Sequence, residues 1–150
     1  MTFYYLDSSA WVKRYYDETG TDWVQALFDN SKPLACSALG LVEVTATLAR
    51  KHKAGAINSS TFGQKIEDLE KDWQNFIHVE LRDEAMDIAA NLAKQLALRG
   101  ADAVHLGSCL LLQRRIPKDD HQVILITSDN EMKEAARISN LAVIDPNEEG

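Results

Sequence analysis

The sequence predicts an α/β protein with a mostly parallel sheet that helices cover on both faces. One observation predicts this fold class, and a second predicts the number of domains. Short apolar runs alternate with longer amphipathic runs, as strands and helices do in such proteins. The chain of 150 residues shows no repeat, linker or low-complexity stretch. A chain of this length can bury one sizeable core, so we expect a single domain over residues 1–150.

Five runs are typical of strands. Thr2 to Leu6 is aromatic and apolar, as expected of a strand buried on both faces, and Val123 to Thr127 is the clearest buried strand. The other strands are expected over residues 34–37, 76–81 and 141–144.

Helices are expected between these runs. Ser8 or Ser9 can cap the first one, which Gly20 would end. Gly100, as a left-handed cap, is expected to end the helix that Asp83 begins. The other helices are expected over residues 21–30, 39–52, 60–73, where Ser59 or Ser60 is the cap, 102–115 and 130–139. The segment 102–115 is apolar almost all round, which predicts that most of it is buried.

Composition excludes some functions. The net charge of −7 argues against a non-specific nucleic-acid coat protein, although acids clustered around a metal would leave a nuclease possible. The apolar runs are too short to span a bilayer, and no signal peptide is visible, so we expect a cytoplasmic protein with no membrane partner. Cys36 and Cys109 lie in apolar segments and are expected to be reduced thiols rather than a disulfide.

Four carboxylates carry the functional prediction: Asp7, Glu43, Asp102 and Asp129. Each lies beside an apolar run, where an anion is costly unless a cation or hydrogen-bond donors accompany it. Asp7 and Asp129 each follow a strand-like run, and ligands of parallel sheets gather at the carboxyl ends of strands. If the four acids converge, their repulsion calls for a divalent ion. The sequence therefore favours a metal-dependent hydrolase.

Each acid also has a structural interpretation. Asp7, Asp102 and Asp129 are all placed where an aspartate can cap a helix. Glu43 is different, because it is mid-helix and either lies in water or faces a cation. No zinc motif is present, and His105 is expected in the core or beside the site rather than on the metal.

Four motifs resemble those of the PIN-domain family of ribonucleases, especially the VapC toxins of toxin–antitoxin pairs. They occur in the family's order along the whole chain: YYLDSSAWVKRYYDETG, SALGLVEVTATLAR, LRGADAVHLGSCLLL and ILITSDNEMKEAA. Two departures, Gly107 for a common alanine and Met132 for a common leucine, do not touch the proposed chemistry.

The resemblance implies a three-layer α/β/α sandwich with about five strands. It implies Mg²⁺- or Mn²⁺-dependent endonucleolytic cleavage of RNA, a homodimer, and a cognate antitoxin that blocks the site. Asp7, Glu43 and Asp102 would be metal ligands, and Asp129 a ligand or an acid acting through water. By the same resemblance, Ser9 and Thr127 would orient carboxylates or water by hydrogen bonds.

Three alternatives stay open at this point. The domain can be PIN-like without catalysis and bind RNA or protein. An unrelated phosphotransfer enzyme is less favoured, because Ser9 stands where its second acid would be and no strand ends in lysine. The basic clusters can contact substrate phosphates or be solvated helix ends. They comprise Lys13 and Arg14, then Arg50, Lys51 and Lys53, then Arg114, Arg115 and Lys118; among single residues, Arg14, Arg50, Lys51 and Arg99 are the candidates for phosphate contact.

Overall fold

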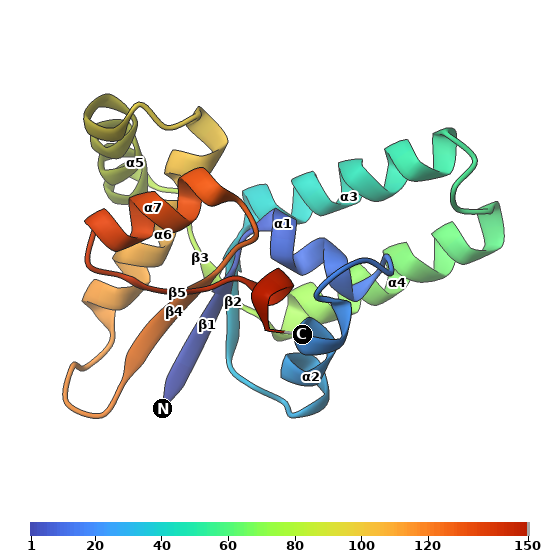
Figure 1. The fold of residues 1–150 in the computed structure, drawn as a ribbon, viewed down its shortest axis with the longest axis horizontal. Helices are drawn as coiled ribbons and strands as arrows, with labels where there is room; N and C mark the ends of the chain where they lie inside the picture. The colour runs from blue at the N-terminus through green and yellow to red at the C-terminus, as the bar shows by residue number, and fades with distance from the viewer. Residues whose placement is uncertain (150) are drawn as a thin grey trace.

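One five-stranded sheet organises the protein. A computed structural model, which describes residues 1–149, gives the strand order β3-β2-β1-β4-β5, and every neighbouring pair is parallel (Figure 1). The strands are β1 (Thr2–Leu6), β2 (Leu34–Ser37), β3 (Ile77–Val79), β4 (Gln122–Ile126) and β5 (Ala142–Ile144). The predicted α/β/α sandwich with a five-stranded parallel sheet is confirmed.

Helices cover the sheet and extend beyond it. α6 packs across β2, β3 and β4, with α5 packed against it, whereas α3 and α4 form an antiparallel pair that projects away from the sheet (Figure 1). The bounds are α1 (Ser8–Trp11), α2 (Thr21–Asp29), α3 (Ala38–Lys53), α4 (Ser59–Asn75), α5 (Asp83–Leu96), α6 (Gly100–Arg115) and α7 (Asn130–Ile138), with 3₁₀ turns η1 (Val12–Arg14) and η2 (Pro146–Glu148). No helix among the described residues is both long and apolar enough to cross a bilayer.

The first helix is shorter than predicted. It does not run to Gly20 but ends after one turn and continues as η1. Asp7, rather than Ser8 or Ser9, is its cap and accepts a hydrogen bond from the amide of Ala10. Tertiary contacts decide the shape here: Trp11 and Tyr15 are buried, and the indole Nε1 of Trp11 donates to the Tyr15 hydroxyl at 2.9 Å.

Three further boundaries differ from the prediction. α5 ends at Leu96 and is followed by Ala97 at φ +53°, whereas Gly100 begins α6 instead of ending α5. Asn58 caps α4 through its side chain, so neither serine does. The third strand covers only the three residues that pair with β2. At the two helix boundaries, a left-handed or polar residue close to the expected one takes the terminal role.

β2 is buried along its whole length, and its neighbours β1 and β4 are buried mainly at their carboxyl ends. Tyr5 and Leu6 of β1 and Leu125 and Ile126 of β4 are fully buried. The buried positions of α6 run through Leu112, as the sequence predicted. Cys36 and Cys109 are buried free thiols.

The chain order creates a switch point in the sheet. From β1 the chain moves to β2 on one side, and it later returns to β4 on the other side. Crossovers that diverge in this way leave a crevice at the carboxyl ends of the two strands, where α/β proteins bind ligands. Asp7 directly follows β1 and Thr127 directly follows β4.

Candidate metal centre at the strand ends

Asp7 is a buried carboxylate held by three donors. The Ser9 hydroxyl donates to Oδ1 at 2.6 Å, the Ala10 amide donates to the same oxygen at 3.1 Å, and the Thr127 hydroxyl donates to Oδ2. Burial raises the pKa of Asp7 above its ordinary value, even though His105 and these hydrogen bonds oppose the shift. A nearby cation would therefore stabilise the ionised form.

Thr127 and Ser9 tie the ends of β1 and β4 together. The Thr127 hydroxyl, which donates to Asp7, also accepts the amide of Asp129 at 3.1 Å. The Ser9 hydroxyl accepts the amide of Ser128 at 3.0 Å. Two hydroxyl side chains thus connect the Asp7 carboxylate to the segment that carries Asp129.

Glu43 faces a cation rather than water alone. Its Oε1 lies 2.5 Å from Nε2 of the buried His105, whose Nδ1 lies 2.9 Å from the Tyr5 hydroxyl. Burial alone would lower the pKa of His105, but hydrogen bonds to Cys36 and Glu43 outweigh it and raise this pKa to about 10. Burial acts to raise the pKa of Glu43, yet its bond to His105 lowers it overall. We assign an imidazolium that donates from both ring nitrogens.

A group of three acids lies beside these residues. One oxygen each from Asp102, Asp129 and Glu131 lies within 4.8 Å of the others. Asp102 is in the first turn of α6, whereas Asp129 caps α7, accepting the Met132 amide on Oδ1 at 3.0 Å. Within residues 1–149, this close group does not include Asp7 or Glu43.

Glu131 was not among the site residues predicted from the sequence. Its position, two residues after Asp129 in the first turn of α7, is the signal that could have found it. Arg99 was predicted only as a candidate for phosphate contact, yet this residue pairs with both Asp102 and Asp129.

The donor chemistry fits a hard divalent cation. Carboxylate oxygens are ligands that Mg²⁺ and Mn²⁺ prefer, and Mg²⁺ commonly uses one or two of them together with water. Asp7, Glu43, Asp102, Asp129 and Glu131 supply five carboxyl groups, against the two cations His105 and Arg99. The carboxylates therefore outnumber the cations, and a bound divalent ion would reduce the repulsion between these carboxylates.

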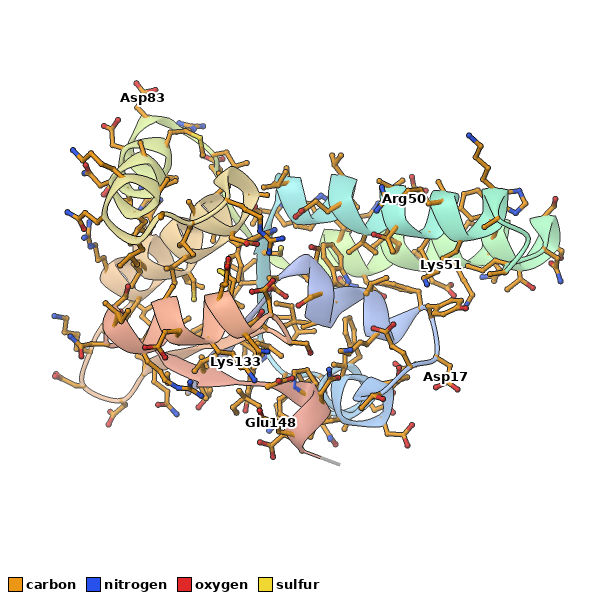
Figure 2. All side chains as sticks on the ribbon, turned by 45° about the horizontal axis from the view of Figure 1, so that its top comes forward. Asp17, Arg50, Lys51, Asp83, Lys133 and Glu148 are labelled. Carbon is orange, nitrogen blue, oxygen red and sulfur yellow. The ribbon has the colours of Figure 1, made fainter. Side chains whose placement is uncertain are left out.

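Several residues of the basic clusters are engaged elsewhere. Arg14 bonds Asp72 at 2.6 Å and lies over the Phe28 ring, at a cavity of about 340 Å³ that Leu34, the first residue of β2, also lines. Lys51 lies 3.8 Å from the centre of the Tyr16 ring. Figure 2 places it with Arg50 on the projecting length of α3. Internal contacts therefore account for Arg14 and Lys51.

Comparison with solved structures shows which proteins share this fold. PAE2754 from Pyrobaculum aerophilum superposes with a TM-score of 0.67 and 18% identity, over 98% of this chain and 91% of that one. VapBC2 from Rickettsia felis, solved bound to a DNA fragment from its promoter, gives a TM-score of 0.64 and 15% identity over 95% and 98% of the two chains.

Sequence comparison then gives the family. The PIN domain model matches residues 4–138, and the chain belongs to the PIN domain family. Ribonuclease VapC45 from Mycobacterium tuberculosis (strain CDC 1551 / Oshkosh) is 40% identical over 114 residues, which cover 73% of this chain and 76% of the relative. The resemblance to VapC-type PIN domains is confirmed.

Proposed function

We propose that this protein is a Mg²⁺- or Mn²⁺-dependent endoribonuclease and the toxin of a type II toxin–antitoxin pair. One observation carries the proposal: in a PIN domain, Asp102, Asp129 and Glu131 have oxygens within 4.8 Å of one another, and Thr127 ties the Asp7 carboxylate to the segment that carries Asp129. The 40% identity to a protein named as a ribonuclease supports RNA as the substrate.

The proposed site uses Asp7, Glu43, Asp102 and Asp129 to hold the ion, with Ser9 and Thr127 orienting Asp7. Glu131 joins this set because its carboxylate lies close to Asp102 and Asp129. When bound, a divalent ion supplies Lewis-acid stabilisation of the phosphate and an activated water at neutral pH. The acids alone cannot stabilise an anionic transition state.

The surrounding residues have distinct tasks in this proposal. Ser9 and Thr127 fix both oxygens of Asp7, so that this carboxylate cannot rotate. The buried His105 is bonded to the Glu43 carboxylate and offsets one negative charge. Mutation of positioning groups of this kind, which lie behind the residues that contact a metal, typically lowers metal affinity or activity by about 10–100-fold.

The proposed partners follow from the relatives. Solved VapBC complexes share this fold, which supports a cognate antitoxin as the partner of this chain. We further propose a homodimer that acts in the cytoplasm, where RNA and the antitoxin are both present.

The decisive experiment compares conservative Asp→Asn variants. Asp7→Asn and Asp102→Asn should abolish cleavage of a total RNA pool in Mg²⁺ or Mn²⁺ while the circular dichroism spectrum stays unchanged. Asp17→Asn is the matched control, because Asp17 is exposed and does not belong to the group of close acids. Chelation with EDTA should stop the wild-type reaction. Full activity of Asp7→Asn in clean preparations would defeat the proposal.

A PIN domain that binds RNA or protein without cleaving it is the second candidate. The presence of all four predicted acids argues against it. Calorimetric titration with Mn²⁺ separates the two: absence of binding at pH 7.5 would favour the non-catalytic module.

A further inference from the structure

One arginine side chain bridges two of the clustered acids. Arg99 precedes α6, and its Nε and Nη2 lie 3.0 and 2.9 Å from Oδ2 of Asp102. The same Nη2 donates to Oδ2 of Asp129 at 2.8 Å. A single guanidinium therefore joins the first turn of α6 to the cap of α7, across thirty positions of sequence.

These contacts involve groups that a metal would need. Asp102 and Asp129 are two of the three acids whose oxygens lie within 4.8 Å of one another. A divalent ion would sit about 2.1 Å from such oxygens, and a cation bonded to the same oxygens would repel it at short range. The guanidinium cannot relieve this repulsion by losing its proton.

The side chain is nevertheless weakly held. It is 67% exposed, its hydrogen bonds and ion pairs among the described residues are all with the two acids, and no ring packs over it there. Arg14 offers the contrast, because its side chain is 24% exposed and packed over Phe28. Displacing Arg99 thus breaks two exposed ion pairs.

We propose that Arg99 is an internal competitor for the divalent ion: it holds Asp102 and Asp129 together in the metal-free protein and leaves them when the ion binds. The inference rests on the proposed function, since it concerns regulation of that same site. Asp102 and Asp129 would then already be held in place before the ion binds. The site would, however, bind the ion less tightly than the same carboxylates would without Arg99.

Calorimetric titration with Mn²⁺ at physiological ionic strength, where the Debye length is about 8 Å, tests the proposal. Exposed ion pairs contribute modestly, so Arg99→Gln should bind Mn²⁺ about three- to tenfold more tightly than the wild type. Arg99→Lys, which keeps the charge but loses the planar fork, should fall between the two.

Arg115→Gln is the matched control. Arg115 lies on α6 as well, is exposed, and pairs with Glu84 at 2.9 Å. It lies thirteen residues beyond Asp102, about 20 Å along the helix. The control removes the same charge without touching the site, and its Mn²⁺ affinity should stay within about twofold of the wild type, because charges so distant are largely screened.

Thermal unfolding gives a second readout that does not depend on activity. In EDTA, Arg99→Gln should melt below the wild type, because Asp102 and Asp129 then repel each other without a cation. The rise in Tm on adding Mn²⁺ should be larger for Arg99→Gln than for the wild type.

The outcomes separate this inference from the proposed function. If the wild type binds Mn²⁺ and Arg99→Gln binds it equally or less tightly, the competitor role fails while the nuclease proposal stands. An equal gain in affinity for Arg115→Gln would also overturn it, since the effect would then be long-range. If neither the wild type nor Arg99→Gln binds Mn²⁺, both proposals fall.

Discussion

Replacing Asp7 by asparagine or by alanine should have very different effects on stability, although both changes should abolish the proposed activity. The Asp7 carboxylate meets three donors in a buried place: the hydroxyls of Ser9 and Thr127 and the amide of Ala10. Alanine removes the acceptor for all three. Asparagine keeps the shape and remains an acceptable helix cap.

The expected magnitudes follow from these contacts. A lost cap costs about 1 kcal/mol, and each buried donor left unpaired costs about 1–3 kcal/mol. Ser9 and Thr127 can partly compensate, because their oxygens are 3.5 Å apart. We therefore expect Asp7→Ala to lose about 2–4 kcal/mol of unfolding free energy. For Asp7→Asn we expect a change within about 1 kcal/mol, because it also removes a carboxylate whose pKa burial raises.

Urea unfolding at pH 7.5 measures both effects, first in EDTA and then with Mn²⁺. In EDTA the two variants should separate clearly, and with Mn²⁺ only the wild type should gain substantial stability. If Asp7→Asn destabilised the protein as much as Asp7→Ala in EDTA, the hydrogen-bond argument would be wrong. Equal stabilisation of the wild type and Asp7→Asn by Mn²⁺ would show that Asp7 does not hold the ion.

Three other changes test separate parts of the structure. Gly40→Ala would place a methyl group against the buried Sγ of Cys36, and overpacking of about 1–3 kcal/mol should exceed the gain of about 1 kcal/mol in helix propensity. A Cys36→Ala background should remove most of that loss in a urea double-mutant cycle. Thr127→Val should lower cleavage about 10–100-fold with an unchanged circular dichroism spectrum, and a smaller loss would deny Thr127 a positioning role. Burial acts to raise the pKa of Asp145, but Lys133 at 2.7 Å lowers it overall. This pair therefore stabilises the fold above about pH 4, and its effect is lost as the pH falls through the lowered pKa of Asp145. Asp145→Asn should therefore make Tm fall less steeply at acid pH. An unchanged fall in Tm would contradict a stabilising role for the Lys133–Asp145 pair. Figure 2 shows Lys133 beside Glu148, its second partner at 2.8 Å.

Much of the fold was predictable because its signals are local. Apolar runs and glycines mark where elements start and stop, and the alternation of element types predicts a parallel sheet. The errors occurred where a tertiary contact decided the boundary. Burial of Trp11 and Tyr15 accompanies the single turn of α1, and Ala97 adopts a left-handed conformation that its sequence does not favour.

The candidate site was predictable only in part, for a similar reason. Sequence position places Asp7 and Asp129 after strands, hence at one edge of the sheet. It does not reveal that Glu131 lies beside Asp102, or that Arg99 spans α6 and α7, because these contacts depend on how two helices pack. The raised pKa of His105 is equally a product of tertiary structure, since its partner Glu43 is 62 residues away.

From the sequence, helix capping and metal binding were competing roles for the aspartates. One carboxylate can serve in both roles, because it has two oxygens. Asp7 receives the α1 amide on Oδ1 and Thr127 on Oδ2; Asp129 receives the α7 amide on Oδ1 and Arg99 on Oδ2. The cap fixes the rotamer, and the fixed rotamer directs the second oxygen away from the helix it caps. At the N-terminus of α7 the helix dipole also favours the anion. A capping aspartate just after a strand is therefore a way to orient one carboxylate oxygen. The segments that follow the adjacent strands β1 and β4 both contain such an aspartate, and these two residues, Asp7 and Asp129, are half of the predicted ligand set.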